Sequence, residues 1–258
     1  MVRVKDLFNL EGQIAVVTGG ATGIGRQLAH GLGEMGAQLV LCSRNFERCS
    51  QVAKEFENEG ISTVPFRCDV TKIEEINPLV ERCLQAFGKI DILVNNAGAT
   101  WAAPAVDMKP ENWAKVISVN LMGAVNASQL VGREMIKRKK GNIINVTSVT
   151  GFVGSDPKNQ DAIAYNTTKG ALHTFTKDLA VKWVQYGIRV NAIAPGWFPT
   201  KLSAWQLENF GEAIKESIPM KRFGLDHELK GAVVFLASEA SSYVTGHILV
   251  VDGGFMAW

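Results

Sequence analysis

The sequence predicts an α/β fold, with one doubly wound parallel sheet and helices on both of its faces. Short apolar runs alternate along the whole chain with segments of helical periodicity, a pattern typical of βαβ units. The apolar runs are nearly continuous rather than alternating with polar residues, so helices should cover both faces of the sheet. No linker, repeat or low-complexity stretch interrupts the 258 residues, and a single domain over residues 1–258 is expected.

Local signals define each expected element in chain order. The first helix has apolar residues at every third or fourth position, Gly60 stops the second, and Pro78 predicts an irregular start to the third. Two long helices follow, of which the second is stopped by Gly187. Strands are expected at residues 13–20, 37–43, 62–70, 90–96, 141–148, 188–196 and 247–254. Helices are expected at residues 24–36, 46–60, 72–88, 111–140, 164–187 and 228–238.

Composition and charge argue against several classes of protein. The 27 basic residues nearly balance 25 acidic ones, which gives no support for nucleic acid as a partner. The N-terminus lacks the apolar core of a signal peptide, and no uncharged apolar stretch reaches about 18 residues, so a cytoplasmic protein without membrane spans is expected. The four cysteines form no CxxC pair and the four histidines are scattered. We therefore expect no metal site, and thiols that are free and buried.

A glycine-rich segment, "TGGATGIG" at residues 18–25, ends the first expected strand and opens the first expected helix. Glycine allows the backbone to turn tightly and approach a pyrophosphate, whose negative charge the free N–H groups of the helix start attract. A glycine cluster alone is weak evidence, but dinucleotide-binding folds use it in this position. The candidate residues for cofactor binding here are Gly19, Thr22, Gly23, Ile24 and Gly25.

The second expected strand ends in "CSRN", where dinucleotide-binding folds meet the adenosine ribose. An acidic residue there binds the ribose of NAD, whereas an arginine accommodates the 2′-phosphate of NADP. This chain has Ser43 and Arg44 and no carboxylate, and the planar guanidinium suits a phosphate ester. The alternative is a solvated loop arginine. The position favours NADP(H) over NAD(H).

Further polar residues stand near the ends of later strands, the edge at which open α/β sheets bind ligands. Asn120 lies in the long helix after "NNAG" (95–98), and Ser148 ends the fifth strand. Tyr165 and Lys169 lie one turn apart on the next helix. Each of these residues alone would more often be structural: a packed tyrosine, a helix cap or a satisfied buried amide.

Together these motifs make the chain resemble a short-chain dehydrogenase/reductase of the single-domain type, over nearly its whole length. They are "TGGATGIG", "NNAG", Asn120 in "ISVNLMG", Ser148 in "NVTSVTG", "YNTTK" and "IAPG", in this order. The resemblance implies a Rossmann-type sheet with the strand order 3-2-1-4-5-6-7. It also implies an NAD(P)-dependent oxidoreductase that acts on CH–OH groups, commonly as a homotetramer.

The resemblance implies a role for each catalytic candidate. Tyr165 is the general acid in ketone reduction and the base in alcohol oxidation, and Lys169 lowers its pKa from an ordinary value of about 10. Lys169 also binds the nicotinamide ribose. Ser148 hydrogen-bonds the substrate oxygen, and Asn120 anchors a water that links Lys169 to solvent. The hydride comes from the nicotinamide.

The resemblance assigns the remaining cofactor contacts as well. Two residues after the third strand flank the adenine, "NNAG" shapes the sheet beneath the cofactor, and a threonine after "PG" meets the nicotinamide amide. The residues assigned in this way are Asp69, Val70, Asn96, Ala97, Gly98, Pro195, Gly196 and Thr200.

The least regular region, residues 196–225, is expected to be a substrate-binding lid. A mouth with large, apolar walls fits an acyl chain or a hydrophobic ketone better than a free sugar. The alternative is that the aromatic residues pack the lid or form a subunit contact. The expected pocket walls are Trp101, Thr150, Phe152, Trp197 and Phe198.

Three functions are compatible with these features. "NNAGATW", "IAPGWFPTKL" and "SIPMKRFG" are similar to 3-oxoacyl-thioester reductases, and the basic cluster 137–140 stands where such enzymes receive an acidic acyl carrier. A basic helix end is also favourable by itself. "CSRN" and the overall layout resemble gluconate 5-dehydrogenases, so polyol or ketose oxidoreduction is the second candidate. A non-catalytic NADP(H)-binding regulator is the third, and the complete catalytic set argues against it.

Ser148 and Tyr165 are 17 positions apart, more than in the commonest family pattern. The extra residues fall in "GSDPKNQDA" (154–162), a polar, turn-forming stretch. Both ends of the loop are anchored, so proximity of the serine and the tyrosine is still expected. The shape of the substrate entrance is harder to carry over from the family.

Overall fold

Seven parallel strands form one sheet in the order β3-β2-β1-β4-β5-β6-β7 in the computed structural model, which describes residues 2–157 and 160–258. The predicted strand order is confirmed. The order reverses direction between β1 and β4, which opens a crevice for a ligand at the carboxyl ends of these strands. The strands are β1 Ile14–Thr18, β2 Gln38–Ser43, β3 Thr63–Arg67, β4 Ile92–Asn95, β5 Gly141–Val146, β6 Ile188–Pro195 and β7 Ile248–Val251.

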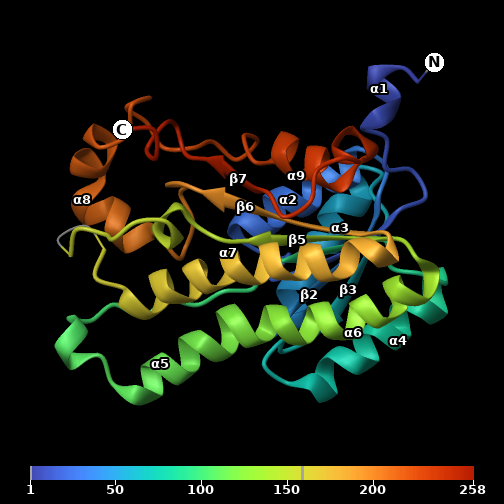
Figure 1. Ribbon diagram of the computed structural model, residues 1–258, viewed down its shortest axis with the longest axis horizontal. Helices are drawn as coiled ribbons and strands as arrows, with labels where there is room; N and C mark the ends of the chain where they lie inside the picture. The colour runs from blue at the N-terminus through green and yellow to red at the C-terminus, as the bar shows by residue number, and fades with distance from the viewer. Residues whose placement is uncertain (1, 158–159) are drawn as a thin grey trace.

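Helices cover both faces of the sheet (Figure 1). Helices α2, α3 and α9 lie on one face, and α4, α6 and α7 lie on the other, while α8 stands at one end of the sheet near the C-terminus. No helix in the described part of the chain is long and apolar enough to cross a membrane. The α-helices are α1 Val4–Leu7, α2 Gly23–Glu34, α3 Phe46–Asn58, α4 Ile73–Phe87, α5 Pro110–Ile117, α6 Gly123–Arg138, α7 Ile163–Trp183, α8 Ala204–Glu216 and α9 Lys230–Ala237.

Two hydrophobic cores lie on the two sides of the sheet. On one side Leu28 of α2 and Phe56 of α3 pack with strand residues, and on the other side Ile76 of α4 and Met135 of α6 do so. All four side chains are fully buried. This agrees with strands that are apolar on both faces. The four cysteines are free and buried, as predicted.

The structure differs from the predicted α-helices in three places, of which the first is the short helix α1, which was not predicted. The long helix expected over 111–140 is divided by a π-helix at Ser118–Met122, which separates α5 from α6. The lid region 196–225 is not irregular throughout, because α8 occupies thirteen of its residues. Helix α8 buries only Ile214 completely, so most of its surface faces away from the core.

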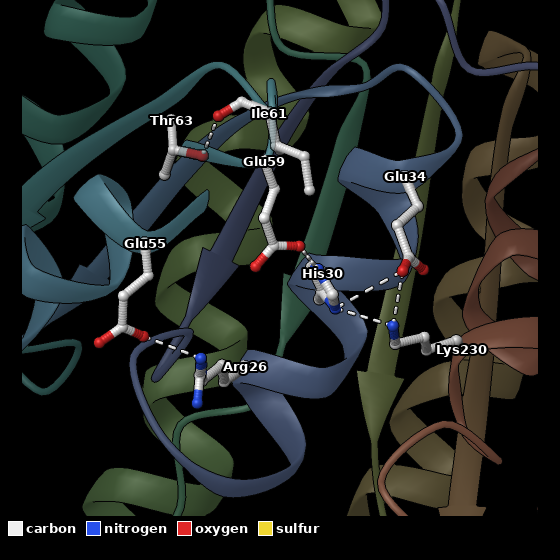
Figure 2. A network of polar contacts seen from close by, with 8 residues as sticks. All are labelled: Arg26, His30, Glu34, Glu55, Glu59, Ile61, Thr63 and Lys230. Atoms are coloured by element: carbon white, nitrogen blue, oxygen red, sulfur yellow. Dashed lines mark hydrogen bonds and ion pairs between the residues drawn. The ribbon is translucent and has the colours of Figure 1, made fainter. Parts of the chain in front are cut away.

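Charged side chains brace α2 against α9 and against the turn that follows α3 (Figure 2). Lys230 Nζ lies 2.7 Å from His30 Nδ1 and 2.8 Å from Glu34 Oε1, and His30 Nε2 lies 2.6 Å from Glu59 Oε2. An ammonium group can only donate, so His30 Nδ1 accepts and Nε2 donates its proton to Glu59. The helix that follows the glycine loop is therefore fixed on two sides.

Candidate functional site

The glycine loop connects β1 to α2 and has the backbone geometry that only glycine adopts readily. Gly19 has φ +64° and Gly23 has φ +50°, both in the left-handed region. Gly25 faces Asn96, and a side chain on Gly25 would collide with the Asn96 amide. That amide donates to the carbonyl oxygens of Thr18 (3.0 Å) and Gly19 (3.2 Å), which holds the loop against the end of β4.

The start of α2 can receive an anion. Thr22 is its N-cap, but no side chain in the described part of the protein bonds to the free N–H groups of the first turn. These uncapped donors, together with the positive end of the helix dipole, suit a phosphate group. The residues present therefore fit the pyrophosphate of a dinucleotide.

A groove of about 960 Å³ runs from this loop past the ends of β4, β5 and β6. Val146, Thr147, Lys201 and Leu202 also line it and were not predicted; the last two follow Thr200 directly in the sequence. The predicted cofactor residues that line it are Gly19, Thr22, Gly23, Ile24, Gly25, Asn96, Ala97, Gly98, Tyr165, Lys169, Pro195, Gly196 and Thr200.

The other four predicted cofactor residues lie at the ends of β2 and β3 and do not line the groove. Ser43 ends β2, and the Arg44 guanidinium is exposed, with no hydrogen-bond or ion-pair partner among the described residues. Burial acts to raise the pKa of Asp69, but hydrogen bonds from Thr71 and the charge of Arg44 outweigh it and lower this pKa. Val70 is buried.

Three of the predicted catalytic residues meet where β5 and α7 approach each other. Ser148 follows β5, and its Oγ accepts from the Thr150 amide (3.2 Å) and hydroxyl (3.0 Å). Tyr165 lies on the first turn of α7 and hydrogen-bonds Ser148. Lys169 Nζ lies 5.5 Å from the centre of the Tyr165 ring. The serine, the tyrosine and the lysine thus form one cluster, despite the long separation in sequence.

Burial dominates the electrostatics of this cluster. Burial raises the pKa of Tyr165, and the Ser148 hydrogen bond opposes this rise. The lysine is itself buried, which lowers its own pKa to about 8. Its ammonium group donates to the Val146 carbonyl at 2.7 Å instead of pointing at the phenol oxygen. The predicted lowering of the Tyr165 pKa by Lys169 stays a prediction.

Asn120 is buried in the π-helix and joins two parts of the site. Its Oδ1 accepts from the Ala99 amide at 2.7 Å, and its Nδ2 donates to the Ala99 carbonyl and to Thr168 Oγ1, each at 3.0 Å. Thr168 in turn donates to the Tyr165 carbonyl at 2.8 Å. The amide therefore connects the segment after β4 to the helix that carries the tyrosine. The predicted water-anchoring role of Asn120 stays a prediction.

A second cavity, of about 580 Å³, opens beside Ser148 and Tyr165. Gln206 of α8 and residues of the segment before that helix form one wall, within the stretch 196–225 that was expected to be a lid; the helix itself was not predicted. The lining residues are Ile24, Thr100, Ser148, Val149, Thr150, Gln160, Tyr165, Gly196, Trp197, Phe198, Thr200, Leu202, Ser203 and Gln206.

Three of the five predicted pocket walls, Thr150, Trp197 and Phe198, line this cavity. Trp101 and Phe152 do not. Trp101 is 40% exposed and lies beneath the Lys115 ammonium, 5.2 Å from the ring centre. Phe152 packs on the His173 ring with 4.0 Å between ring centres. Lys158 and Asn159, from the inserted stretch 154–162, lie outside the described residues.

A family model described as enoyl-(acyl carrier protein) reductase matches residues 19–256. The chain belongs to the short-chain dehydrogenase/reductase family. Homologous oxidoreductases act on CH–OH groups, and this short-chain dehydrogenase/reductase is an NAD(P)-dependent oxidoreductase.

Curated relatives of this short-chain dehydrogenase/reductase carry two different names. It is 38% identical over 255 residues to 5-keto-D-gluconate 5-reductase of Escherichia coli K12, covering 98% of this chain and 99% of the relative. It is also 38% identical over 249 residues to 3-oxoacyl-(acyl-carrier-protein) reductase FabG of Thermotoga maritima, covering 96% and 100%. The two names correspond to the two resemblances found in the sequence.

Among solved structures, this chain is similar to a gluconate 5-dehydrogenase from Burkholderia cenocepacia J2315 in complex with NADP and tartrate. The TM-score is 0.94 at 38% identity, over 99% of this chain and 100% of the other.

Within the described residues of the present protein, no group of three or more histidine, cysteine or acidic side chains could hold a metal ion.

Proposed function

We propose that the protein reduces the ketone of an uncharged substrate segment with NADPH, and that a 3-oxoacyl thioester is the best candidate. The cavity beside Tyr165 carries this proposal, because none of its described lining residues is charged. A buried carboxylate without a cationic partner is costly. Trp197, Phe198 and Val149 supply apolar contacts, which suit the keto end of an acyl chain.

Each residue beside the cavity and the groove would have its own role in the reaction. Tyr165 would donate a proton to the carbonyl oxygen as that oxygen becomes an alkoxide, and Ser148 would hydrogen-bond the same oxygen. The buried Lys169 would hold the ribose of the nucleotide. The uncapped start of α2 would hold the pyrophosphate. The nicotinamide supplies the hydride when it is bound.

The preference for NADP(H) rests on Arg44. Its guanidinium is exposed at the end of β2 and has no hydrogen-bond or ion-pair partner among the described residues, so it can bind the 2′-phosphate bidentately. Ser43 beside it adds a neutral hydroxyl rather than a repelling carboxylate. We propose NADP(H) as the preferred cofactor on this ground.

A carrier protein as partner receives less support than the sequence suggested. In the basic cluster 137–140, Lys137 pairs with Glu134 at 2.7 Å. Arg138 pairs with the buried Asp91 at 2.7 Å. Half of the cluster is therefore occupied by structural ion pairs, and Lys139 and Lys140 are left to attract an acyl carrier. Assembly as a homotetramer is a further proposal, which rests on the family resemblance.

Polyol or ketose oxidoreduction is the second candidate. The amide side chains of Gln160 and Gln206 line the same cavity and could bind the hydroxyl groups of a sugar. The relative named 5-keto-D-gluconate 5-reductase is as similar to this chain as the acyl reductase is.

A substrate panel separates the two candidates. NADPH oxidation is followed with acetoacetyl-CoA, 5-keto-D-gluconate and fructose, and alcohol oxidation with gluconate and mannitol. The proposal predicts the highest kcat/KM for acetoacetyl-CoA, and loss of turnover in Tyr165→Phe with NADPH binding retained. Brisk turnover of the sugar substrates without turnover of the thioester would overturn the substrate assignment. A Tyr165→Phe variant of undiminished kcat would overturn the catalytic assignment.

A further inference from the structure

The turn that follows Ser148 packs closely on the backbone of α7. This turn is a 3-10 helix over Val149–Gly151. A Cβ atom built on Gly151 would lie 2.7 Å from His173 Cε1, and 2.8 Å from both the Gly170 amide nitrogen and the Lys169 carbonyl carbon. A Cβ atom on Gly170 would lie 3.1 Å from the Gly151 carbonyl oxygen. The two glycines therefore face each other across the joint between turn and helix.

The need for glycine here is one of space rather than of backbone conformation. Neither Gly151 nor Gly170 has a positive φ. Real Cβ atoms essentially never lie below 3.0 Å from such neighbours, so a side chain on Gly151 would force the turn away from α7. The backbone atoms it would meet belong to the middle of a 21-residue helix and cannot move aside easily.

A pair of tilted rings packs beside the same contact. The Phe152 ring lies 4.0 Å from the ring of His173, which is buried on the next turn of α7. Burial and the charges of Lys177 and Lys169 lower the pKa of His173 to about 4, so the ring is neutral at physiological pH. A neutral imidazole packs against the phenyl ring without bringing a second buried charge close to Lys169.

We propose that Gly151 and Gly170 are positioning residues, which set the separation between the Ser148 hydroxyl and the Tyr165 phenol through direct backbone contact. Ser148 is three residues before Gly151, and Tyr165 is five residues before Gly170. The contact lies close to both reacting groups. The proposal rests on the catalytic roles proposed for that serine and that tyrosine.

The contact also explains why Ser148 and Tyr165 lie together although 17 positions separate them in the sequence. The segment between Phe152 and Ile163 begins directly after the turn and ends at the start of α7. Its length does not determine the distance between Ser148 and Tyr165, because the glycine contact fixes that distance independently.

Substitution of the glycines gives a specific kinetic signature. In Gly151→Ala the turn moves outward and Ser148 loses contact with Tyr165, and a displacement of about 1 Å can lower the rate about 100-fold. The expected result is a fall in kcat of that order with acetoacetyl-CoA, or with the best ketone of the panel. The affinity for NADPH, titrated by fluorescence, is unchanged. Gly170→Ala, with its milder 3.1 Å contact, gives a smaller fall.

The pH profile separates positioning from a merely structural effect. The Ser148 hydrogen bond opposes the rise in the pKa of Tyr165, so its loss raises that pKa further. The alkaline limb for ketone reduction therefore moves to higher pH in Gly151→Ala. Gly154→Ala is the matched control, because a Cβ there meets nothing within 4 Å. It should retain the wild-type kcat and pH profile.

Two results would overturn the proposal. One is a Gly151→Ala variant with wild-type kcat and pH profile, and the other is a fall in kcat that parallels a loss of NADPH binding. If Gly151→Ala does not fold, Gly170→Ala is judged by the same two criteria. Full activity in Tyr165→Phe would instead refute the proposed function, so the two failures are distinguishable.

Discussion

The Lys169 ammonium group lies 2.7 Å from the Val146 carbonyl oxygen, to which it donates a hydrogen bond. This bond connects the helix that carries Tyr165 to the end of the strand that precedes Ser148. The lysine is only 4% exposed, so it holds its charge in a site that water hardly reaches. Burial of the charged lysine therefore lowers the stability of the fold, at the same residue that is proposed to hold the ribose.

That cost predicts a pH-dependent stability difference between wild type and Lys169→Met. Burial lowers the pKa of Lys169 from 10.5 to about 8, so between these values the unfolded chain binds a proton that the folded chain does not. The free energy of unfolding of wild type should therefore rise by about 3 kcal/mol, relative to the variant, as the pH increases through this window. Denaturant unfolding at pH 7 and at pH 10.5 measures this change. A constant difference would contradict the buried-charge argument.

Ser148→Ala should lower kcat about 100- to 1000-fold, since it removes one hydrogen bond to the developing alkoxide. It also removes the hydrogen bond that holds the pKa of Tyr165 down, so the alkaline limb of ketone reduction moves to higher pH. Steady-state kinetics over a pH series tests both effects. Ser242→Ala, an exposed serine far from the site, is the control. A lower kcat with an unmoved limb would show that Ser148 does not act through the tyrosine.

Arg44→Ala should weaken NADPH binding about 10- to 100-fold and leave NADH binding unchanged, because a charge-assisted hydrogen bond contributes about 1.5–3 kcal/mol. Fluorescence titration of both nucleotides gives the two dissociation constants. Arg48→Ala provides a nearby control, since Arg48 is half-buried and its guanidinium bonds to Gln51. Equal weakening of NADPH and NADH would remove the basis for the cofactor preference.

Asp91→Asn should destabilise the fold by about 1.5–3 kcal/mol, because it weakens the charge-assisted hydrogen bonds of a buried carboxylate to two partly exposed cations. Asp91 bonds to Arg138 (2.7 Å), Lys89 (2.9 Å) and the Ile14 amide (2.9 Å). Burial acts to raise the pKa of Asp91, but these three contacts outweigh it and the pKa is lowered.

The stabilisation by Asp91 is therefore present above the unfolded pKa of about 3.9 and is lost as the pH falls through the lower folded pKa. Urea unfolding at pH 7 and at acidic pH should show the difference from wild type shrinking on acidification. Glu134→Gln, which affects an exposed pair with Lys137, should change stability by less than about 1 kcal/mol. An equally large effect of both substitutions would contradict this account.

The strands could be predicted because their signal is local, whereas their order in the sheet followed from the family resemblance. Each strand is an apolar run that ends at a turn residue, and Gly19, with φ +64°, ends β1 where the glycine motif begins. The cofactor groove could be predicted as well, because the carboxyl ends of parallel strands lie at one edge of the sheet. Position along a strand is therefore enough to bring Asn96, Pro195 and Gly196 to one groove.

Side-chain direction and burial could not be predicted in the same way. Trp101 and Phe152 follow functional motifs directly, yet one side chain is exposed and the other packs on His173. The spacing of Tyr165 and Lys169 gave their common helical face but not the direction of the ammonium, which Val146 determines. The π-helix was also missed, because its residues carry the same apolar pattern as an ordinary helix.

The contact between Gly151 and Gly170 also separates the geometry of the reacting groups from the shape of the substrate entrance. If the backbone joint sets the reacting geometry, then residues 154–162 can be lengthened, shortened or exchanged without altering it. A library confined to this stretch would explore new substrates while the proton donor and its serine stay in place. The fold would thus offer protein engineers an interchangeable entrance on an unchanged reaction centre.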